Sequence, residues 1–122
     1  MPGTFFGIQT AATGLAAAQF VTPDAPRTGI ADEFRVLKRP LIANVTGGAG
    51  IPRIANSNLI MITSAVPGEG KSFCAVNLAM SMAMELERTV LLVDADVARP
   101  SLPQKLGFAE GQGLMNVLLD RS

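Results

Sequence analysis

The sequence contains no histidine, no tyrosine and no tryptophan, and it has a single cysteine, Cys74, among its 122 residues. Without histidine, and with only one thiol, this chain cannot by itself build a Cys/His metal site, a Ser/His or Cys/His nucleophile pair, or an internal disulfide. Disulfides are rare in reducing compartments, so we expect a cytosolic setting.

An excess of charge of either sign is also missing. The chain has 10 Lys and Arg residues against 10 Asp and Glu residues, and its longest basic run is the pair Lys38 and Arg39. Nucleic acids and anionic membrane surfaces are bound through clustered Lys and Arg. We therefore expect neither as a partner.

Long hydrophobic runs are absent from the first 29 residues, where the most apolar stretch is residues 15–20. A membrane span needs roughly 18 apolar residues, and a secretory signal needs a basic start, whereas no Lys or Arg precedes Arg27. Residues 1–29 are rich in Gly, Ala, Thr and Pro and predict a flexible lead or linker. A short helix that forms on a partner is the alternative. Residues 30–122 are then one domain, or part of a larger one.

Apolar residues at helical spacing, Ile30, Phe34 and Leu37, predict a helix of two to three turns that Pro40 should end or kink. A glycine-rich loop follows. The later residues 72–87 are built from good helix formers and predict a second helix. Within it, a polar stripe is expected to face solvent. Its members, spaced four residues apart, are Asn77, Ser81 and Glu85.

Two short apolar runs, residues 59–62 and 89–93, flank this second helix. Continuous apolar runs of this length are typical of strands that are buried on both faces of a parallel sheet. A strand, a helix and a strand within about 35 residues form one right-handed βαβ unit. The sequence therefore predicts an α/β fold, a parallel sheet with flanking helices.

The junction between the first run and the second helix carries a phosphate-loop pattern, Ser-Ala-Val-Pro-Gly-Glu-Gly-Lys-Ser over residues 64–72. Gly68 and Gly70 let successive backbone N–H groups turn toward phosphate oxygens, and the helix N-terminus adds its positive dipole. Lys71 supplies a cation for the β- and γ-phosphates, and the Ser72 hydroxyl is a hard ligand for Mg²⁺. The predicted nucleotide-binding residues are Pro67, Gly68, Glu69, Gly70, Lys71, Ser72 and Phe73.

Two carboxylates, Asp94 and Asp96, end the second run. Ligand sites of open α/β sheets lie at the carboxyl ends of the strands. Alternate residues of an extended chain point to the same side, where a divalent cation can offset the repulsion of two like charges. The alternative is a solvated turn in which Asp96 caps the following segment. Beside a phosphate loop, we favour metal binding.

Both motifs together resemble the bacterial tyrosine kinases, P-loop autokinases that accompany exopolysaccharide synthesis and export. The resemblance covers residues 30–122 and is strongest to the autokinases of exosortase-linked polysaccharide clusters. It includes the helix at residues 32–39, the phosphate loop and residues 89–101 with their two Asp and an Arg. It implies a P-loop NTPase fold, binding of ATP, ADP and Mg²⁺, and phosphoryl transfer to tyrosine.

The resemblance implies roles for individual residues. Lys71 and Ser72 bind phosphate and Mg²⁺, Asp96 is a further Mg²⁺ contact, and Asp94 assists the attacking tyrosine hydroxyl, so that Lys71, Asp94 and Asp96 form the catalytic set. The family's Glu-x-x-Arg-x-x-Arg oligomerisation segment is matched by a helix that would join copies of the chain. Its residues here are Asp32, Arg35 and Lys38. A polysaccharide-export partner at the inner face of the plasma membrane is also implied.

Three departures separate the chain from the family pattern. Arg99 lies one residue later than in the commonest Asp-x-Asp-x-Arg form, and neither a Walker B strand nor a tyrosine-rich tail is present in the 122 residues. The chain contains no tyrosine that it could phosphorylate. We therefore expect the front half of a kinase domain, truncated after its second core strand.

Two alternatives remain, one from the same branch of P-loop proteins and one from a different class. A partition or division-site ATPase shares the phosphate loop, but its signature carries a Lys where this chain has Pro67. The second alternative is a nucleotide-binding fragment without turnover. Two strands leave part of a P-loop sheet open to water or to another chain, so marginal stability and self-association are expected.

Overall fold

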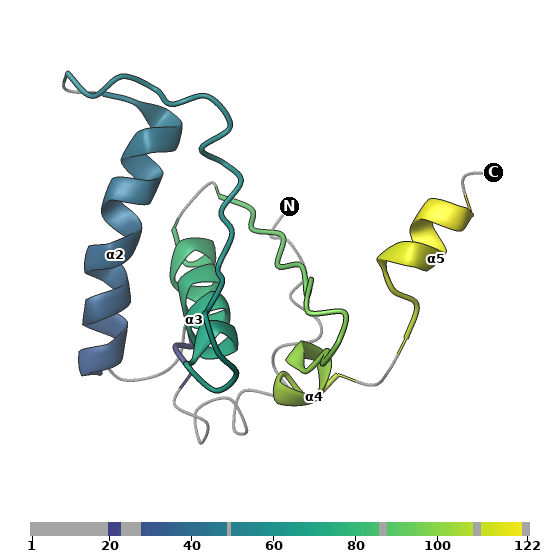
Figure 1. The fold of residues 1–122 in the computed structure, drawn as a ribbon. Coiled ribbons are helices and arrows are strands. Elements are labelled where there is room, and N and C mark those ends of the chain that lie inside the picture. The colour runs from purple at the N-terminus through teal and green to yellow at the C-terminus, as the bar shows by residue number, and fades with distance from the viewer. Residues whose placement is uncertain (1–19, 23–27, 49, 86–87, 109–110, 121–122) are drawn as a thin grey trace.

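A computed structural model describes residues 20–22, 28–48, 50–85, 88–108 and 111–120 of the chain. Its helices are α2 (Gly29–Thr46), α3 (Lys71–Ala83), α4 (Leu102–Lys105) and α5 (Leu114–Leu119). Helices α2 and α3 lie side by side, whereas α5 stands apart from the rest of the chain (Figure 1). None of the described helices is both long and apolar enough to cross a bilayer.

Helix α2 is longer than the sequence predicts. It begins after Thr28, whose hydroxyl accepts a hydrogen bond from the Ala31 N–H at 3.2 Å, and it continues through Pro40 to Thr46. The returning loop stabilises its last turn, because the Ile54 N–H and the Ser57 hydroxyl both donate to the Asn44 carbonyl. Helix carbonyls near a C-terminus need such external donors. Pro40 was predicted to end or kink the helix, and the structure shows that it does not end it.

Helix α3 confirms the predicted second helix over most of its length, although residues 86–87 lie outside the described residues. Two members of its polar stripe face inward, which corrects the solvent-facing prediction for them, whereas the third, Glu85, is exposed as predicted. Asn77 and Ser81 are fully or almost fully buried. The Asn77 amide accepts from the Val21 N–H at 2.6 Å and donates to the Phe73 carbonyl at 3.0 Å. Burial of Asn77 is tolerated because both ends of its amide are paired.

Residues 20–22 are buried against α3, so the predicted boundary of a flexible lead at residue 29 is too late for them. Phe20, Val76 and Leu102 form the core, and Leu92 packs on it. The rings of Phe20 and Phe73 stack with their centroids 5.7 Å apart. The rest of the predicted lead, residues 1–19 and 23–27, lies outside the described residues.

The predicted strands have no partners among the described residues, where the only β-pairing is an isolated bridge between Gly48 and Ile51. Residues 59–62 and 89–93 run as coil instead (Figure 1). Side chains in the second run still alternate as in a strand, because Val90 and Leu92 are half-buried while Leu91 and Val93 are exposed. A pleated chain places successive side chains on opposite sides. The sheet itself remains a prediction.

Candidate functional site

The phosphate loop adopts the turn that its glycines predict. Gly68 and Gly70 have φ values of 86° and 90°, a left-handed conformation that other residues rarely adopt. Gly70 is the N-cap of α3 and offers no side-chain oxygen to the first N–H groups of the helix. These donors and the helix dipole are the features that bind a phosphate group.

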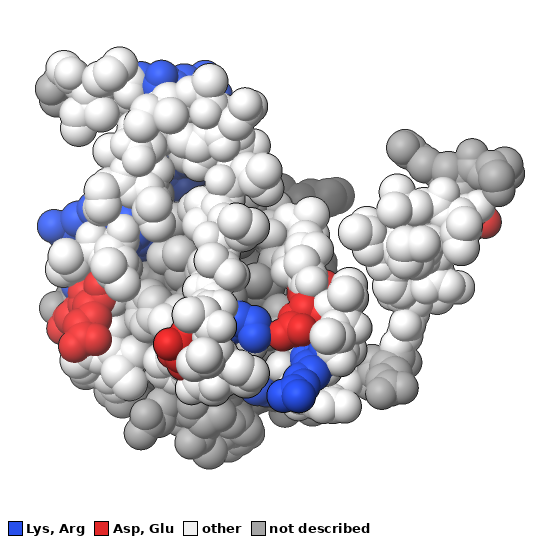
Figure 2. All heavy atoms as spheres, in the orientation of Figure 1, with Lys and Arg blue, Asp and Glu red and all other residues white. Residues whose placement is uncertain are grey.

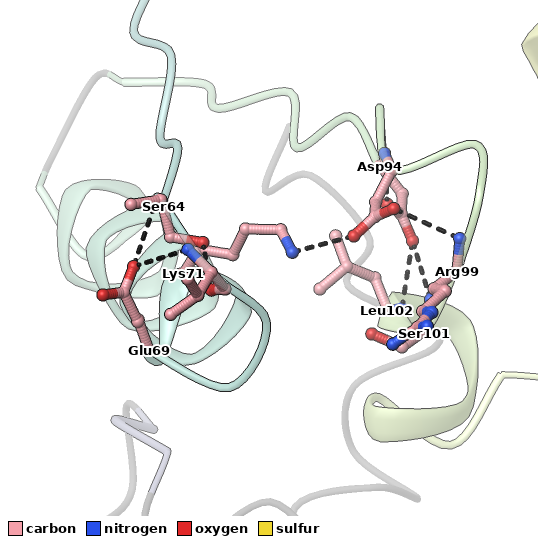
Figure 3. A network of polar contacts seen from close by, with 10 residues as sticks. Ser64, Glu69, Lys71, Asp94, Arg99, Ser101 and Leu102 are labelled. Carbon is pink, nitrogen blue, oxygen red and sulfur yellow. Dashed lines mark hydrogen bonds and ion pairs between the residues drawn. The ribbon is translucent and has the colours of Figure 1, made fainter.

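Glu69 stabilises the backbone of this loop through its exposed side chain. One of its carboxylate oxygens accepts hydrogen bonds from the Ala65 N–H at 2.8 Å and the Val66 N–H at 3.1 Å. The hydroxyl of Ser64 closes the same turn by donating to the Val66 carbonyl at 3.1 Å. Glu69 was predicted as a nucleotide-binding residue, but its side chain is engaged with the loop backbone. It therefore fixes the loop's shape (Figure 3).

Lys71 links the loop to the acidic motif. Its ammonium lies 2.8 Å from an Asp96 carboxylate oxygen, and both side chains are about one-third exposed. The Lys71 hydrogen bond lowers the pKa of Asp96 below its ordinary value, and the backbone N–H of Arg99 acts in the same direction. Two motifs that are 25 residues apart in the sequence thus meet in space, as the prediction of one shared site requires (Figure 3).

The Asp94 carboxylate holds the start of α4. One oxygen accepts from the Ser101 and Leu102 N–H groups, each at 3.1 Å, and the other accepts from the Asp96 N–H at 3.1 Å. The carboxylate therefore stabilises the start of α4 and the turn that carries Asp96. The arrangement differs from the predicted pair of carboxylates facing one cation, because Asp94 holds the start of α4 while Asp96 pairs with Lys71.

The remaining predicted nucleotide contacts divide into two groups. Ser72 lies half-buried in the first turn of α3, on the element that carries Lys71, and Pro67 is exposed at the turn of the loop. Phe73 differs, because its ring packs on Phe20 and Phe34 and forms part of the hydrophobic interior. Only the backbone of Phe73 can serve a phosphate.

A Mg²⁺ ion fits the donors present better than a softer metal. The described residues contain no cluster of three or more His, Cys, Asp or Glu side chains that could hold a metal by themselves. Mg²⁺ does not require such a cage, because it keeps several waters and is held by one or two protein oxygens together with nucleotide phosphates. The Ser72 hydroxyl and the Asp96 carboxylate are oxygen donors of this kind.

The predicted oligomerisation residues of α2 have different environments. Lys38 is buried, and its ammonium donates to the Ser81 carbonyl at 2.7 Å and pairs with Glu85 at 2.6 Å. Lys38 therefore fastens α2 to the end of α3 within one chain. Asp32 and Arg35 form a partly exposed ion pair at 3.4 Å. That α2 joins copies of the chain stays a prediction, and of the three predicted residues Asp32 and Arg35 are the ones accessible to a second copy.

Sequence reasoning missed two contacts, that of Lys38 on α3 and that of Asp94 on α4. Only the last has a local signal, because Ser101 and Pro103 after the acidic motif are typical of a helix start. The partners of Lys38 lie 43 and 47 positions away in the sequence, where no motif connects them.

Known proteins with similar sequences fall into two groups. The chain is 37% identical over 99 residues to the succinoglycan biosynthesis transport protein ExoP of Rhizobium meliloti (strain 1021), an alignment that covers 81% of this chain. It is 46% identical over 63 residues, or 52% of its length, to the tyrosine-protein kinase YwqD of Bacillus subtilis (strain 168). The resemblance to bacterial tyrosine kinases linked to exopolysaccharide is thereby confirmed.

An iron-sulfur cluster carrier protein of Pseudomonas fragi represents the second group, at 42% identity over 72 residues, or 58% of this chain. The chain spans 12%, 26% and 25% of these three proteins, respectively. No solved structure matches the chain. A family model described as ParA, NUBPL iron-transfer P-loop NTPase, matches residues 55–118. Because this match spans just over half of its length, the chain belongs to the ParA family of P-loop NTPases.

Proposed function

We propose that this chain is the ATP-binding part of a protein-tyrosine autokinase that regulates exopolysaccharide synthesis or export. The observation that carries the proposal is the 2.8 Å contact between Lys71 and Asp96, which joins the phosphate loop to the acidic motif. The names of the relatives ExoP and YwqD support the assignment to exopolysaccharide and to tyrosine phosphorylation.

The chain's own residues would act by positioning and charge neutralisation, which provide most of the catalysis in phosphoryl transfer. The N–H groups at the start of α3 would bind the phosphates, and Lys71 would exchange Asp96 for a phosphate oxygen. Ser72 and Asp96 would hold Mg²⁺, which neutralises charge that develops on the transferred phosphoryl group. Asp94 would keep Asp96 in place through its hydrogen bond to the Asp96 N–H.

The proposal includes the partners that the kinase resemblance implies. ATP and ADP are the nucleotides, and copies of the chain would associate through the exposed Asp32 and Arg35 of α2. The acceptor tyrosine must come from outside the 122 residues, because they contain none. We place the protein in the cytoplasm, at the inner face of the membrane, beside a polysaccharide-export partner. No nucleic acid is proposed as a partner.

Iron-sulfur transfer is the second candidate, because the family model and the carrier proteins carry that description. Iron-sulfur clusters are held by several Cys thiolates. This chain offers only Cys74, on the exposed side of α3. A cluster would require thiolates from a second copy or from other sequence, so tyrosine phosphorylation is favoured over iron transfer. The partition ATPase stays open as a third candidate within the same family.

The proposal is tested first by calorimetric titration of ATP into the 122-residue chain, with and without Mg²⁺. Lys71→Ala should weaken binding by about tenfold to a hundredfold, the effect of losing one hydrogen bond from a charged donor. Lys105→Ala, at the exposed end of α4, is the matched control and should bind as the parent chain does. A folded chain that binds no nucleotide would contradict the proposal.

A transfer assay then separates the three candidates. The chain is incubated with γ-labelled ATP and a Glu/Tyr copolymer that supplies the acceptor. Labelled phosphotyrosine that Lys71→Ala abolishes supports the kinase. Phosphate release without labelling of the copolymer favours the partition ATPase and contradicts the kinase. Visible absorption after incubation with ferrous iron and sulfide, without phosphotyrosine, favours the iron-sulfur carrier.

A further inference from the structure

The cation of the phosphate loop already has a partner within the chain. The Lys71 ammonium lies 2.8 Å from a carboxylate oxygen of Asp96, and Figure 3 shows the Lys71 side chain extended from the start of α3 toward the acidic turn. In a phosphate loop this ammonium is the group that pairs with the β- and γ-phosphates of a nucleotide. Nucleotide phosphates therefore have to compete with the Asp96 carboxylate for the same positive charge.

The competing carboxylate is held in place by the backbone around it. The second oxygen of Asp96 accepts the Arg99 N–H at 3.1 Å, and the Asp96 N–H donates to Asp94 at 3.1 Å. Asp94 in turn accepts from the N–H of Leu102, which belongs to the buried core. Asp96 is therefore anchored to the interior, whereas Lys71 reaches it on a flexible four-carbon stem. When the pair opens, Lys71 is the side chain that moves.

A nucleotide without a divalent cation meets this competitor directly. Its phosphates must take the Lys71 ammonium from Asp96, and the carboxylate that stays behind has lost its positive partner. A charged group that loses its partner costs free energy unless another partner replaces it. For a nucleotide that arrives with Mg²⁺ this cost is smaller, because a freed carboxylate oxygen is a ligand of the kind that Mg²⁺ binds. The pair therefore weakens the binding of the two forms of the nucleotide unequally.

We propose that Asp96 is a specificity-determining residue, whose competition for Lys71 makes the phosphate loop bind nucleotide more weakly when the nucleotide lacks a divalent cation. The inference rests on the proposed function only in that the loop binds ATP, and it does not depend on which group receives the phosphate. It narrows the ligand of the site to a nucleoside triphosphate that already carries Mg²⁺. Both side chains are about one-third exposed. Ion pairs of this kind are weak, so we expect the pair to contribute a discrimination of about fivefold.

The experiment is an NMR titration of ATP into the 122-residue chain, once in excess EDTA and once in Mg²⁺. Asp96→Asn keeps a side-chain oxygen for the Arg99 N–H but removes the charge. It should bind ATP about fivefold more tightly in EDTA, and the ratio of the affinities with and without Mg²⁺ should fall by at least about that factor. Asp120→Asn removes the same charge directly after α5, which Figure 2 shows as a separate lobe, and should leave both affinities unchanged.

A double-mutant cycle tests whether Lys71 is the group for which Asp96 competes. The Lys71→Ala chain has no ammonium to release, so adding Asp96→Asn to it should change the affinity in EDTA by about twofold or less. Asp96→Ser, which also keeps an acceptor, replaces Asp96→Asn if far-UV circular dichroism shows unfolding.

Three results would each overturn the inference: no gain in EDTA from Asp96→Asn, an equal gain in the Lys71→Ala background, or the same gain from Asp120→Asn. A folded parent chain that binds no ATP even with Mg²⁺ would overturn the proposed function and this inference with it. A parent chain that binds ATP with Mg²⁺, while Asp96→Asn gains nothing in EDTA, would overturn this inference alone.

Discussion

The buried ammonium of Lys38 gives the sharpest prediction about stability. It lies between α2 and α3, where it donates to the Ser81 carbonyl and pairs with Glu85. Lys38→Met keeps the length and apolar character of the side chain but removes the charge and its donors. The Ser81 carbonyl, in the last turn of α3, then loses a donor in a buried setting. We expect the free energy of unfolding to fall by about 1–3 kcal/mol.

Urea titration followed by far-UV circular dichroism measures this change, since the chain has neither tryptophan nor tyrosine to report by fluorescence. The same loss should lower Tm by roughly 5–20 °C in a domain of this size. Arg39→Met, the next residue on α2 and exposed, is the control and should change the free energy of unfolding by no more than about 0.5 kcal/mol. Equal stability of the two variants would refute the role of Lys38.

The pH dependence of the stability difference between the parent chain and Lys38→Met gives a second test of the role of Lys38. The hydrogen bond and the charge of Lys38 lower the pKa of Glu85 below its ordinary value of 4.5. A carboxyl whose pKa is lowered by folding stabilises the protein above its unfolded pKa, and this contribution disappears as the pH falls through the folded pKa. The difference between the parent chain and Lys38→Met should therefore be greatest above about pH 5 and smaller in acid.

The phosphate loop gives two further predictions. Lys71 lowers the pKa of Asp96 below its ordinary value of 3.8. The free energy of unfolding that Lys71→Ala loses should therefore be constant above about pH 5 and should diminish in acid. Urea titrations at several pH values measure this loss, and a loss that grows in acid would contradict the prediction. Glu69→Ala should speed hydrogen exchange of the Ala65 and Val66 amides about fivefold or more, because each amide loses a hydrogen bond. NMR spectra measure the exchange rates, and unchanged rates would show that Glu69 does not stabilise the loop.

Local patterns predicted the helices and the turns of the two motifs more accurately than the contacts between distant segments. The glycines of the loop and the two Asp residues fix their own turns, because the chemistry of each turn lies within a few residues. The meeting of Lys71 with Asp96 was predictable because a βαβ unit brings both ends to one edge of a sheet. Helix α2 was predicted too short, since the donors that satisfy its last turn, Ile54 and Ser57, lie in a later loop that the helical spacing does not describe.

Burial of polar groups was the main error, and its cause is physical. Asn77 and Lys38 occur at positions where a polar residue normally faces water, and only the groups opposite them make burial acceptable. For Asn77 this group is the Val21 N–H, 56 positions away, and for Lys38 it is the end of α3. Periodicity describes one helix at a time and carries no information about such a partner.

The pairing of α2 with α3 also has a kinetic consequence. Each helix is held by local hydrogen bonds, and their contact is the most extensive between any two described elements. A unit of this kind forms early, because short loops close faster than distant strands can pair. During synthesis on the ribosome, the helical pair would therefore assemble first, before the apolar runs at residues 59–62 and 89–93 are covered.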